Sequence, residues 1–328
     1  MLVVGANGAG KTNLLESLHV GTQGFSPRTR SDAQLIRFGE SSARVALRGL
    51  RGESALDLEL ALRAGEAKRA RVNGAPLRAA EQLRAEVATL VFTPDRLAIV
   101  KGGPAVRRAY VDRVLARLAP ARATLSAEYG AAVAQRNASL RRIAGGFSTV
   151  DALAPWTARV AELGSSLVEA RREAVAQLGP AFAERAGELG LADTVLRYEG
   201  EEPTVEELER RSARDTERGW TSVGPHLDDV AILAGDRDLR GFGSQGEQRI
   251  AVLSLLLGEA DLLTERSGIS PLLLLDDVLS ELDPGRRRIL AERIARHGQT
   301  LVTSTTAEAL PTEPAQVLEV TPGRATSR

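Results

Sequence analysis

Two groups of residues at opposite ends of the chain have the types and spacing of a site for a nucleoside triphosphate. The first is the stretch GANGAGKT, which satisfies every fixed position of the pattern G-x-x-x-x-G-K-[ST]. Its glycines let backbone N–H groups turn inward around phosphate oxygens. Lys11 is suited to reach the β and γ phosphates, and Thr12 to ligate Mg²⁺. The predicted nucleotide-binding residues of this loop are Gly5, Ala6, Asn7, Gly8, Ala9, Gly10, Lys11 and Thr12.

The second group is a carboxylate pair, Asp276 and Asp277, which follows the continuous apolar run PLLLL. We expect Asp276 to hold Mg²⁺, directly or through water, and Asp277 to orient or deprotonate the attacking water, so that Lys11 and Asp277 are the predicted catalytic residues. Neighbouring side chains on a strand point to opposite faces, which suits two roles better than one shared site. Taken alone, the pair would also fit a helix-capping aspartate at a strand end. The complete phosphate loop in the same chain favours the metal and base roles.

A third candidate lies shortly before the carboxylates, in the stretch GFGSQGEQRIAVLSLLLGEA. Ser244 and Gly246 stand at the start of a predicted helix, where a hydroxyl, backbone N–H groups and a positive helix end all favour an anion. The same residues fit an ordinary N-capped helix equally well, because serine is a common cap.

The elements around these motifs follow from local patterns. Leu2 to Val4 reads as the end of a buried strand, and a helical pattern begins at Lys11, so a chance glycine-rich turn is the weaker interpretation of the loop. Residues 44–73 form short alternating runs, which indicates an antiparallel meander with a hairpin turn at Asn73-Gly74. Residues 87–93 form another apolar run.

The middle of the chain has helical spacing. From about residue 104 to 190, apolar residues recur three and four positions apart. We expect prolines to separate the helices of this region, namely Pro120, Pro155 and Pro180. Residues 199–218 are mostly charged and are expected to be exposed. The stretch DVAILAGDRDL predicts a hairpin that turns near Gly235-Asp236.

Composition limits the class of protein. The 43 Lys and Arg residues balance the 43 Asp and Glu residues, so net charge does not indicate a polyanionic partner. Residues 101–180, however, contain 12 basic and 6 acidic side chains, whereas residues 181–240 contain 8 and 15. One segment is therefore suited to face a polyanion. There is no cysteine, no apolar run long enough to cross a membrane and no signal peptide, which favours a cytoplasmic protein without a membrane partner.

The order of these motifs resembles the head domains of the ABC/SMC class, and most closely the RecF family of recombinational repair ATPases. Further stretches that carry the resemblance are RSDAQLIRFGE (30–40), LVFTPDRLAIVKGGPAVRRAYVDRVL (90–115), QRNASL (135–140), TSVGPHLDD (221–229), FGSQGEQR and LLLLDDVLSELD. They span nearly the whole chain, and their order is more specific than any one motif.

The resemblance implies an α/β fold: an ABC-type ATPase head, with a phosphate-loop sheet and an antiparallel meander, and a large, mostly helical second lobe. Lobe I is expected to be discontinuous, with residues 1–95 and 270–328. Lobe II, with residues 96–269, would carry the signature motif.

The resemblance also implies a mechanism. Two protomers would trap ATP and Mg²⁺ between them, with Ser244 and Gly246 of one contacting the γ phosphate held by the other, and residues 280–283 at the dimer seam. Such ATP-dependent homodimers bind gapped or junction DNA and, with RecR and RecO, help RecA to load. An aspartate at the base position predicts slow hydrolysis. The basic segment supplies the candidate DNA contacts, each of which also fits a solvated helix face: Arg107, Arg108, Arg113, Arg141 and Arg142.

The sequence departs from the family pattern at several places. Leu227 stands where the family usually has arginine, and Thr303 and Ser304 lie near the place of a transporter histidine. The segment that precedes the phosphate loop in the family is missing, so we expect a translation start assigned too far downstream. Two other functions remain open: the ATPase subunit of a transporter, and a clamp that binds ATP without hydrolysing it.

Overall fold

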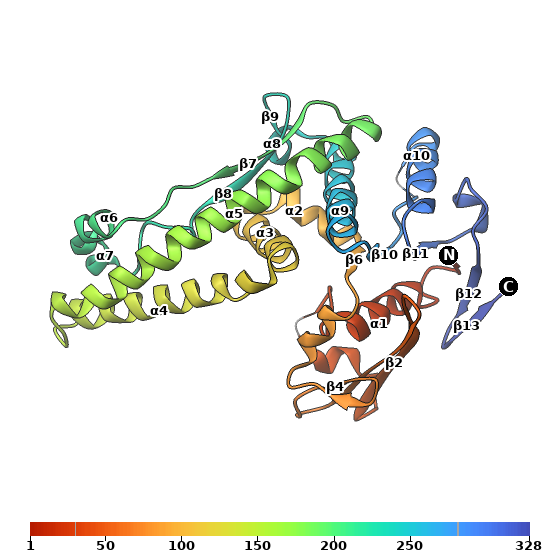
Figure 1. Ribbon diagram of the computed structural model, residues 1–328, viewed down its shortest axis with the longest axis horizontal. Helices are drawn as coiled ribbons and strands as arrows, with labels where there is room; N and C mark the ends of the chain where they lie inside the picture. The colour runs from red at the N-terminus through yellow and green to blue at the C-terminus, as the bar shows by residue number, and fades with distance from the viewer. Residues whose placement is uncertain (30, 281) are drawn as a thin grey trace. The chain divides into compact units, whose positions relative to one another are not determined.

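The computed structural model describes residues 1–29, 31–280 and 282–328 (Figure 1). The chain divides into two compact units, one of residues 1–96 with 263–328 and one of residues 97–262. Each unit is described by itself below. None of the helices in the described ranges is both long and apolar enough to cross a membrane.

The first unit is built on a six-stranded sheet in the order β13-β12-β1-β11-β10-β6. All neighbouring strands are parallel except β12 and β13. The central strands are almost wholly buried, and β1 and β10 are continuous apolar runs, as expected for a parallel sheet covered on both faces. Their carboxyl ends therefore meet at one edge, where the phosphate loop and the aspartates follow. The strands are β1 (Leu2–Val4), β6 (Thr89–Phe92), β10 (Leu272–Leu275), β11 (Thr300–Ser304), β12 (Val317–Thr321) and β13 (Arg324–Ser327).

Helix α1 (Lys11–Gln23) follows the phosphate loop, and α10 (Pro284–Ala295) follows the aspartates. The apolar side chains of α1 divide between two clusters. Leu15 packs with residues of the six-stranded sheet, whereas Val20 packs against the meander. Short 3-10 turns complete the unit: η1 (Asp32–Leu35), η2 (Ala80–Ala85), η3 (Pro94–Leu97, on the boundary) and η6 (Ala307–Ala309).

The meander of the first unit is an antiparallel sheet in the order β2-β3-β4-β5. The hairpin turn predicted at Asn73-Gly74 is confirmed, with φ of 48° and 81°, the left-handed conformation that a two-residue turn requires. Alternate residues of β3 face α1 and form the apolar side of the sheet. The strands are β2 (Ser42–Arg51), β3 (Ser54–Arg63), β4 (Arg69–Val72) and β5 (Ala75–Pro76).

The second unit is mostly helical. Its longest feature is a helical hairpin in which α4 and α5 lie side by side and run in opposite directions (Figure 1). A three-stranded antiparallel sheet in the order β7-β8-β9 packs on α5 and α3. The helices are α2 (Ala98–Lys101), α3 (Pro104–Leu118), α4 (Leu125–Ala144), α5 (Ala154–Glu188), α6 (Val205–Arg210), α7 (Ser212–Arg218), α8 (Leu239–Phe242) and α9 (Gln245–Ser267, whose last five residues belong to the first unit). The strands are β7 (Thr194–Glu199), β8 (Asp229–Ala234) and β9 (Arg237–Asp238), the last two forming the predicted hairpin. Short turns η4 (Pro120–Arg122) and η5 (Val150–Leu153) precede α4 and α5.

Two expectations for this unit are wrong. Pro180 does not end a helix, because α5, which is 35 residues long in all, continues through it to Glu188. A proline inside a helix removes one backbone hydrogen bond, but here the helix is buried along much of its length, and that packing outweighs the loss. Pro155 lies in the first turn of the same helix, where its missing N–H costs nothing.

The charged region 199–218 is not wholly exposed either. Asp215 is completely buried and pairs with the equally buried Arg136 of α4, with 2.9 Å between Nη1 and Oδ2. The same guanidinium also donates to the Thr221 hydroxyl and to the Leu208 carbonyl oxygen. These bonds fasten α6 and α7 to the helical hairpin.

Candidate functional site

The phosphate loop has the backbone geometry that its sequence predicts. Gly10, with φ of 107°, ends the loop at the start of α1, a conformation that side chains disfavour. Gly5 lies so close to β12 that a Cβ would come within 2.5 Å of the Val320 carbonyl oxygen. The Lys11 ammonium donates to the Gly5 and Ala6 carbonyl oxygens at 2.8 and 3.0 Å. The first turn of α1 has no acidic side chain, so its positive end stays available to an anion.

Asp276 joins this loop to the other end of the chain. The Thr12 hydroxyl donates to Asp276 Oδ2 at 2.9 Å, and the Thr303 hydroxyl donates to Oδ1 at 2.7 Å. Asp276 is 6% exposed. A hydroxyl next to one buried carboxylate is a donor set that Mg²⁺ accepts when phosphate oxygens and waters fill its other positions. The residues therefore fit the expected metal, and the described residues contain no group of three or more His, Cys, Asp or Glu that would form an all-protein cage.

Asp277 differs from its neighbour in burial and in backbone. β10 ends at Leu275, so the strand alternation expected for the pair does not apply to it. Asp277 instead has a left-handed backbone with φ of 50°, which is unusual outside glycine, and its side chain is exposed. Its N–H donates to the Thr303 hydroxyl at 2.8 Å. The structure thus places a buried carboxylate next to an exposed one, and Thr303 bonds to the side chain of the first residue and to the backbone of the second.

These groups line one cavity of about 270 Å³. It contains most of the predicted loop residues and both aspartates, but also residues that the sequence reasoning missed. Those are Asn13, Arg28 and Thr305, together with Thr303, whose position was noticed but whose role was not. Arg28 forms an ion pair with Glu16 of α1 at 3.2 Å. Nothing in the local sequence distinguishes Arg28 from other loop arginines.

The segment that carries Ser244 lies in the second unit. Ser244 and Glu247 form a reciprocal capping box: the Ser244 N–H donates to Glu247 Oε2 at 2.7 Å, and the Glu247 N–H donates to the Ser244 hydroxyl at 3.2 Å. Hydrogen bonds from Ser244 and Arg237 lower the pKa of Glu247 to about 2. Ser244 therefore does act as the N-cap of a helix, as one of the two interpretations predicted. The hydroxyl accepts in this bond and keeps its own hydrogen for a further partner, and Ser244 and Gly246 are both exposed.

The predicted DNA-contacting arginines do not share one environment. Arg107 is 4% exposed and paired with Asp229, so a direct phosphate contact is not compatible with its position. Arg108 is half-buried and donates to the Asp228 carbonyl oxygen at 2.6 Å. Arg113 is half-buried, and burial lowers its pKa. Arg141 and Arg142, at the end of α4, are exposed.

Part of the predicted dimer seam can be described. Asp283 caps α10 by accepting from the Arg286 N–H at 3.0 Å, and the Ser280 hydroxyl donates to the Asp277 carbonyl oxygen at 3.1 Å. Glu281, within the same seam, and Arg30, at the start of the family-like stretch 30–40, lie outside the described residues.

Comparison with known proteins decides the family. Residues 1–327 match the family described as RecF/RecN/SMC N terminal domain. A DNA replication and repair protein RecF of Heliobacterium modesticaldum is 35% identical over 318 residues, which cover 93% of this chain and 86% of the relative. The chain belongs to the RecF family. The RecF of Acidothermus cellulolyticus is 38% identical over 322 residues, with 92% and 86% covered.

The fold agrees with this assignment to the RecF family. A solved structure described as the recombination mediator protein RecF-ATP in the RecFOR pathway superposes with a TM-score of 0.89, at 26% identity, covering 100% of this chain and 91% of that one. An Smc head domain derived from Pyrococcus furiosus gives 0.56 at 15% identity, which supports the fold alone. The expected α/β head, with its phosphate-loop sheet, antiparallel meander and mostly helical second part, is confirmed. Leu227, the position at which the resemblance led us to expect arginine, is 47% exposed.

Proposed function

We propose that this chain is an ATP-dependent DNA-binding protein of recombinational repair and replication restart. ATP drives two copies into a homodimer that holds gapped or junction DNA, and slow hydrolysis releases it. With RecR and RecO, the dimer promotes loading of RecA. The observation that carries the proposal is the hydrogen bond between Thr12 and Asp276, because it unites the phosphate loop and the carboxylate strand in one cavity.

Within the nucleotide site, each residue has a distinct task. The loop amides and Lys11 bind the phosphates of ATP, and Thr12 and Asp276 hold Mg²⁺, which supplies charge neutralisation at the phosphate oxygens. Asp277 orients or deprotonates the attacking water. What supports this division is the contrast in burial between Asp276 and Asp277, and the hydroxyl of Thr303 that bonds to both.

Ser244 and Gly246 of one copy close over the triphosphate that the other copy holds through Lys11. Their exposure at the start of α9 supports this role. A ligand that binds the paired state and not the separated one shifts the equilibrium by mass action. At about 100 times its dissociation constant, ATP would stabilise the dimer by roughly 2.7 kcal/mol. Hydrolysis removes that contribution, so the complex acts as a timer.

DNA is held mainly through its phosphates. With Arg107 excluded by burial, the candidate contacts are Arg108, Arg113, Arg141 and Arg142. Arg141 and Arg142 are the exposed members of this set, and guanidinium groups bind phosphate without reading sequence, which agrees with recognition of a DNA structure.

The test is binding of gapped DNA with and without ATP by the wild type, Lys11→Ala and Asp277→Asn. Lys11→Ala should lose the ATP-dependent increase in DNA binding. Asp277→Asn should still bind ATP and DNA but should release DNA more slowly after ATP is removed. A clamp that never hydrolyses ATP predicts no effect of Asp277→Asn, and that result would exclude the timer.

A further inference from the structure

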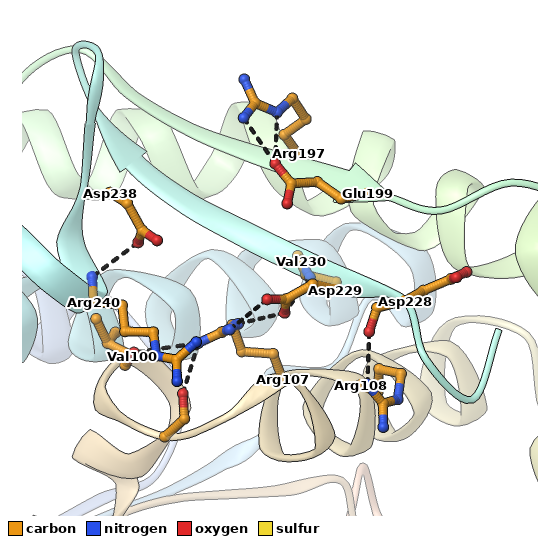
Figure 2. A network of polar contacts seen from close by, with 11 residues as sticks. Val100, Arg107, Arg108, Arg197, Glu199, Asp228, Asp229, Val230, Asp238 and Arg240 are labelled. Carbon is orange, nitrogen blue, oxygen red and sulfur yellow. Dashed lines mark hydrogen bonds and ion pairs between the residues drawn. The ribbon is translucent and has the colours of Figure 1, made fainter. Parts of the chain in front are cut away.

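The guanidinium of Arg107 makes four hydrogen bonds within the second unit (Figure 2). Nε and Nη2 donate to the two carboxylate oxygens of Asp229 at 2.7 and 2.6 Å, the parallel arrangement that gives arginine–carboxylate pairs their strength. Nη1 donates to the Gly102 carbonyl oxygen at 2.8 Å and reaches the Val100 carbonyl oxygen at 3.4 Å. The side chain therefore bonds to a carboxylate through one edge of its guanidinium and to backbone carbonyl oxygens through Nη1.

Those bonds join Arg107 of α3 to the neighbouring α2 and its following turn, and to a strand that begins 122 residues later. Val100 belongs to α2, Gly102 forms the turn between α2 and α3, and Asp229 is the first residue of β8. The turn is tight, since a Cβ on Gly102 would come within 2.4 Å of the Ala98 carbonyl oxygen. Burial alone raises the pKa of Asp229, but the hydrogen bonds from Arg107 and the Val230 N–H outweigh it and hold that pKa below its usual value. Asp229 is therefore ionised at neutral pH and forms a stable ion pair with Arg107.

Three short elements connect Asp229 to Ser244 along the chain: β8, β9 and α8. β8 and β9 form a hairpin, and Asp238 caps α8 by accepting from the Arg240 N–H at 2.9 Å (Figure 2). α8 packs against α2, the helix whose Val100 carbonyl oxygen faces Arg107. Gln248 of α9 then donates to the Leu239 carbonyl oxygen at 2.8 Å, which fixes the start of α9 to α8. Ser244 lies between these two helices.

We propose that the Arg107–Asp229 pair is a positioning element for Ser244 and Gly246. It fixes α2 against the β8–β9 hairpin, and α8 and the first turn of α9 take their orientation from both. This inference rests on the proposed function, in which Ser244 closes over the triphosphate of a second copy. A segment held in one orientation before the copies meet does not lose conformational freedom when they associate.

The placement also explains why Arg107 is not a DNA contact. A phosphate could reach the guanidinium only by displacing Asp229, which would leave a carboxylate beside the phosphate. Lysine at this position keeps the charge but cannot form the two parallel bonds. Arg107→Lys therefore separates geometry from charge. Arg197 offers a matched control, because it lies on the exposed side of β7 and, among the described residues, its two hydrogen bonds both go to the Glu199 carboxylate (Figure 2).

The first experiment uses hydrogen exchange on the full chain without nucleotide. Arg107→Lys and Asp229→Asn should speed exchange of the backbone amides of residues 239–248 by about tenfold or more, whereas Arg197→Lys should leave them unchanged. Circular dichroism and thermal unfolding verify that each variant is folded. Unchanged exchange at residues 239–248 in folded Arg107→Lys would overturn the proposal, whatever the fate of the proposed function.

The second experiment separates binding from closure. Arg107→Lys should bind a fluorescent ATP analogue as tightly as the wild type, but its ATP-driven dimerisation by sedimentation should be about tenfold weaker. Normal dimerisation of folded Arg107→Lys would contradict the inference, and a weaker salt dependence of DNA binding in Arg107→Gln, which removes the charge, would instead make Arg107 a DNA contact. If the wild type itself does not dimerise with ATP, the proposed function fails, and the hydrogen-exchange result still decides the role of Arg107 within the fold.

Discussion

Thr12 and Asp276 lie 264 residues apart in the chain, yet the Thr12 hydroxyl donates a 2.9 Å hydrogen bond to the Asp276 carboxylate. One residue follows β1 and the other follows β10, two strands that flank β11 in the same parallel sheet. The parallel arrangement is what brings the two ends of the chain to one cavity. This bond is the basis of the metal and nucleotide assignment.

Thr12→Val should weaken ATP binding in the presence of Mg²⁺ by on the order of tenfold or more, because the hydroxyl is one of the two protein groups suited to the ion. Without Mg²⁺, the loss should be small. Thr12→Ser keeps the hydroxyl and serves as the control. Titration with a fluorescent ATP analogue, with and without a chelator, measures the difference, and equal losses in both conditions would contradict the metal role.

Thr303→Val should impair hydrolysis more than ATP binding. The hydroxyl donates to the Asp276 carboxylate and accepts from the backbone N–H of Asp277, so its removal loosens that carboxylate and the backbone that positions Asp277. The free energy of unfolding should fall by about 1–3 kcal/mol, because buried groups lose their partners. Steady-state hydrolysis and urea unfolding test this prediction against Thr303→Ser. Unaltered hydrolysis in folded Thr303→Val would show that Thr303 does not hold the catalytic geometry.

Arg136→Met should destabilise the second unit by about 3–5 kcal/mol, because it leaves the buried Asp215 carboxylate without its charged partner. Arg142→Met, on the same helix but exposed, should change stability by less than about 0.5 kcal/mol. Urea denaturation of the two variants gives the comparison. A similar small effect of both would mean that the buried pair contributes nothing beyond packing.

The stability of the second unit should decrease as the pH falls below the ordinary histidine pKa of 6.5. Burial lowers the pKa of His226, and the charge of Arg108 adds to this, although the Thr221 carbonyl oxygen and nearby carboxylates such as Asp228 oppose it. A group whose folded-state pKa is depressed contributes its stability above the unfolded-state value and loses it as the pH drops through the folded-state value. In His226→Gln, the melting temperature should depend less on pH between about pH 8 and pH 5.5 than it does in the wild type. An equal slope in both proteins would exclude His226 as the cause.

DNA affinity should fall as the salt concentration rises. If six phosphates are neutralised, the logarithm of the binding constant should fall with the logarithm of the salt concentration with a slope of about −5. Replacing Arg141 and Arg142 together by glutamine should reduce that slope by about 2, without altering ATP binding. Fluorescence anisotropy with gapped DNA over a salt series provides the measurement. A flat salt response of the wild type would rule out phosphate-dominated binding.

The local parts of the fold could be predicted from sequence because their causes are local. The glycines of the phosphate loop, the apolar run before Asp276 and the turn at Asn73-Gly74 each need particular residue types at adjacent positions. In the structure, each of these segments has the backbone conformation that its residue pattern predicts. The same is true of the hairpin formed by β8 and β9.

The features that could not be predicted from sequence depend on partners that are distant along the chain. Asp215 is buried only because Arg136, 79 residues earlier, neutralises it, and no periodicity in residues 199–218 indicates this. Pro180 is tolerated because of the packing of α5, which outweighs a local penalty. Arg107 looked like a surface cation because its partner Asp229 lies 122 residues away.

The most direct test of the account is complementation between two inactive variants, Lys11→Ala and Ser244→Arg. If each triphosphate lies between Lys11 of one copy and Ser244 of the other, a mixed dimer contains one intact site. An equimolar mixture should then recover about a quarter of the wild-type ATPase rate, because half of randomly formed dimers are mixed and each has one of two sites. A mixture as inactive as either variant alone, with mixed dimers shown to form, would contradict the shared site.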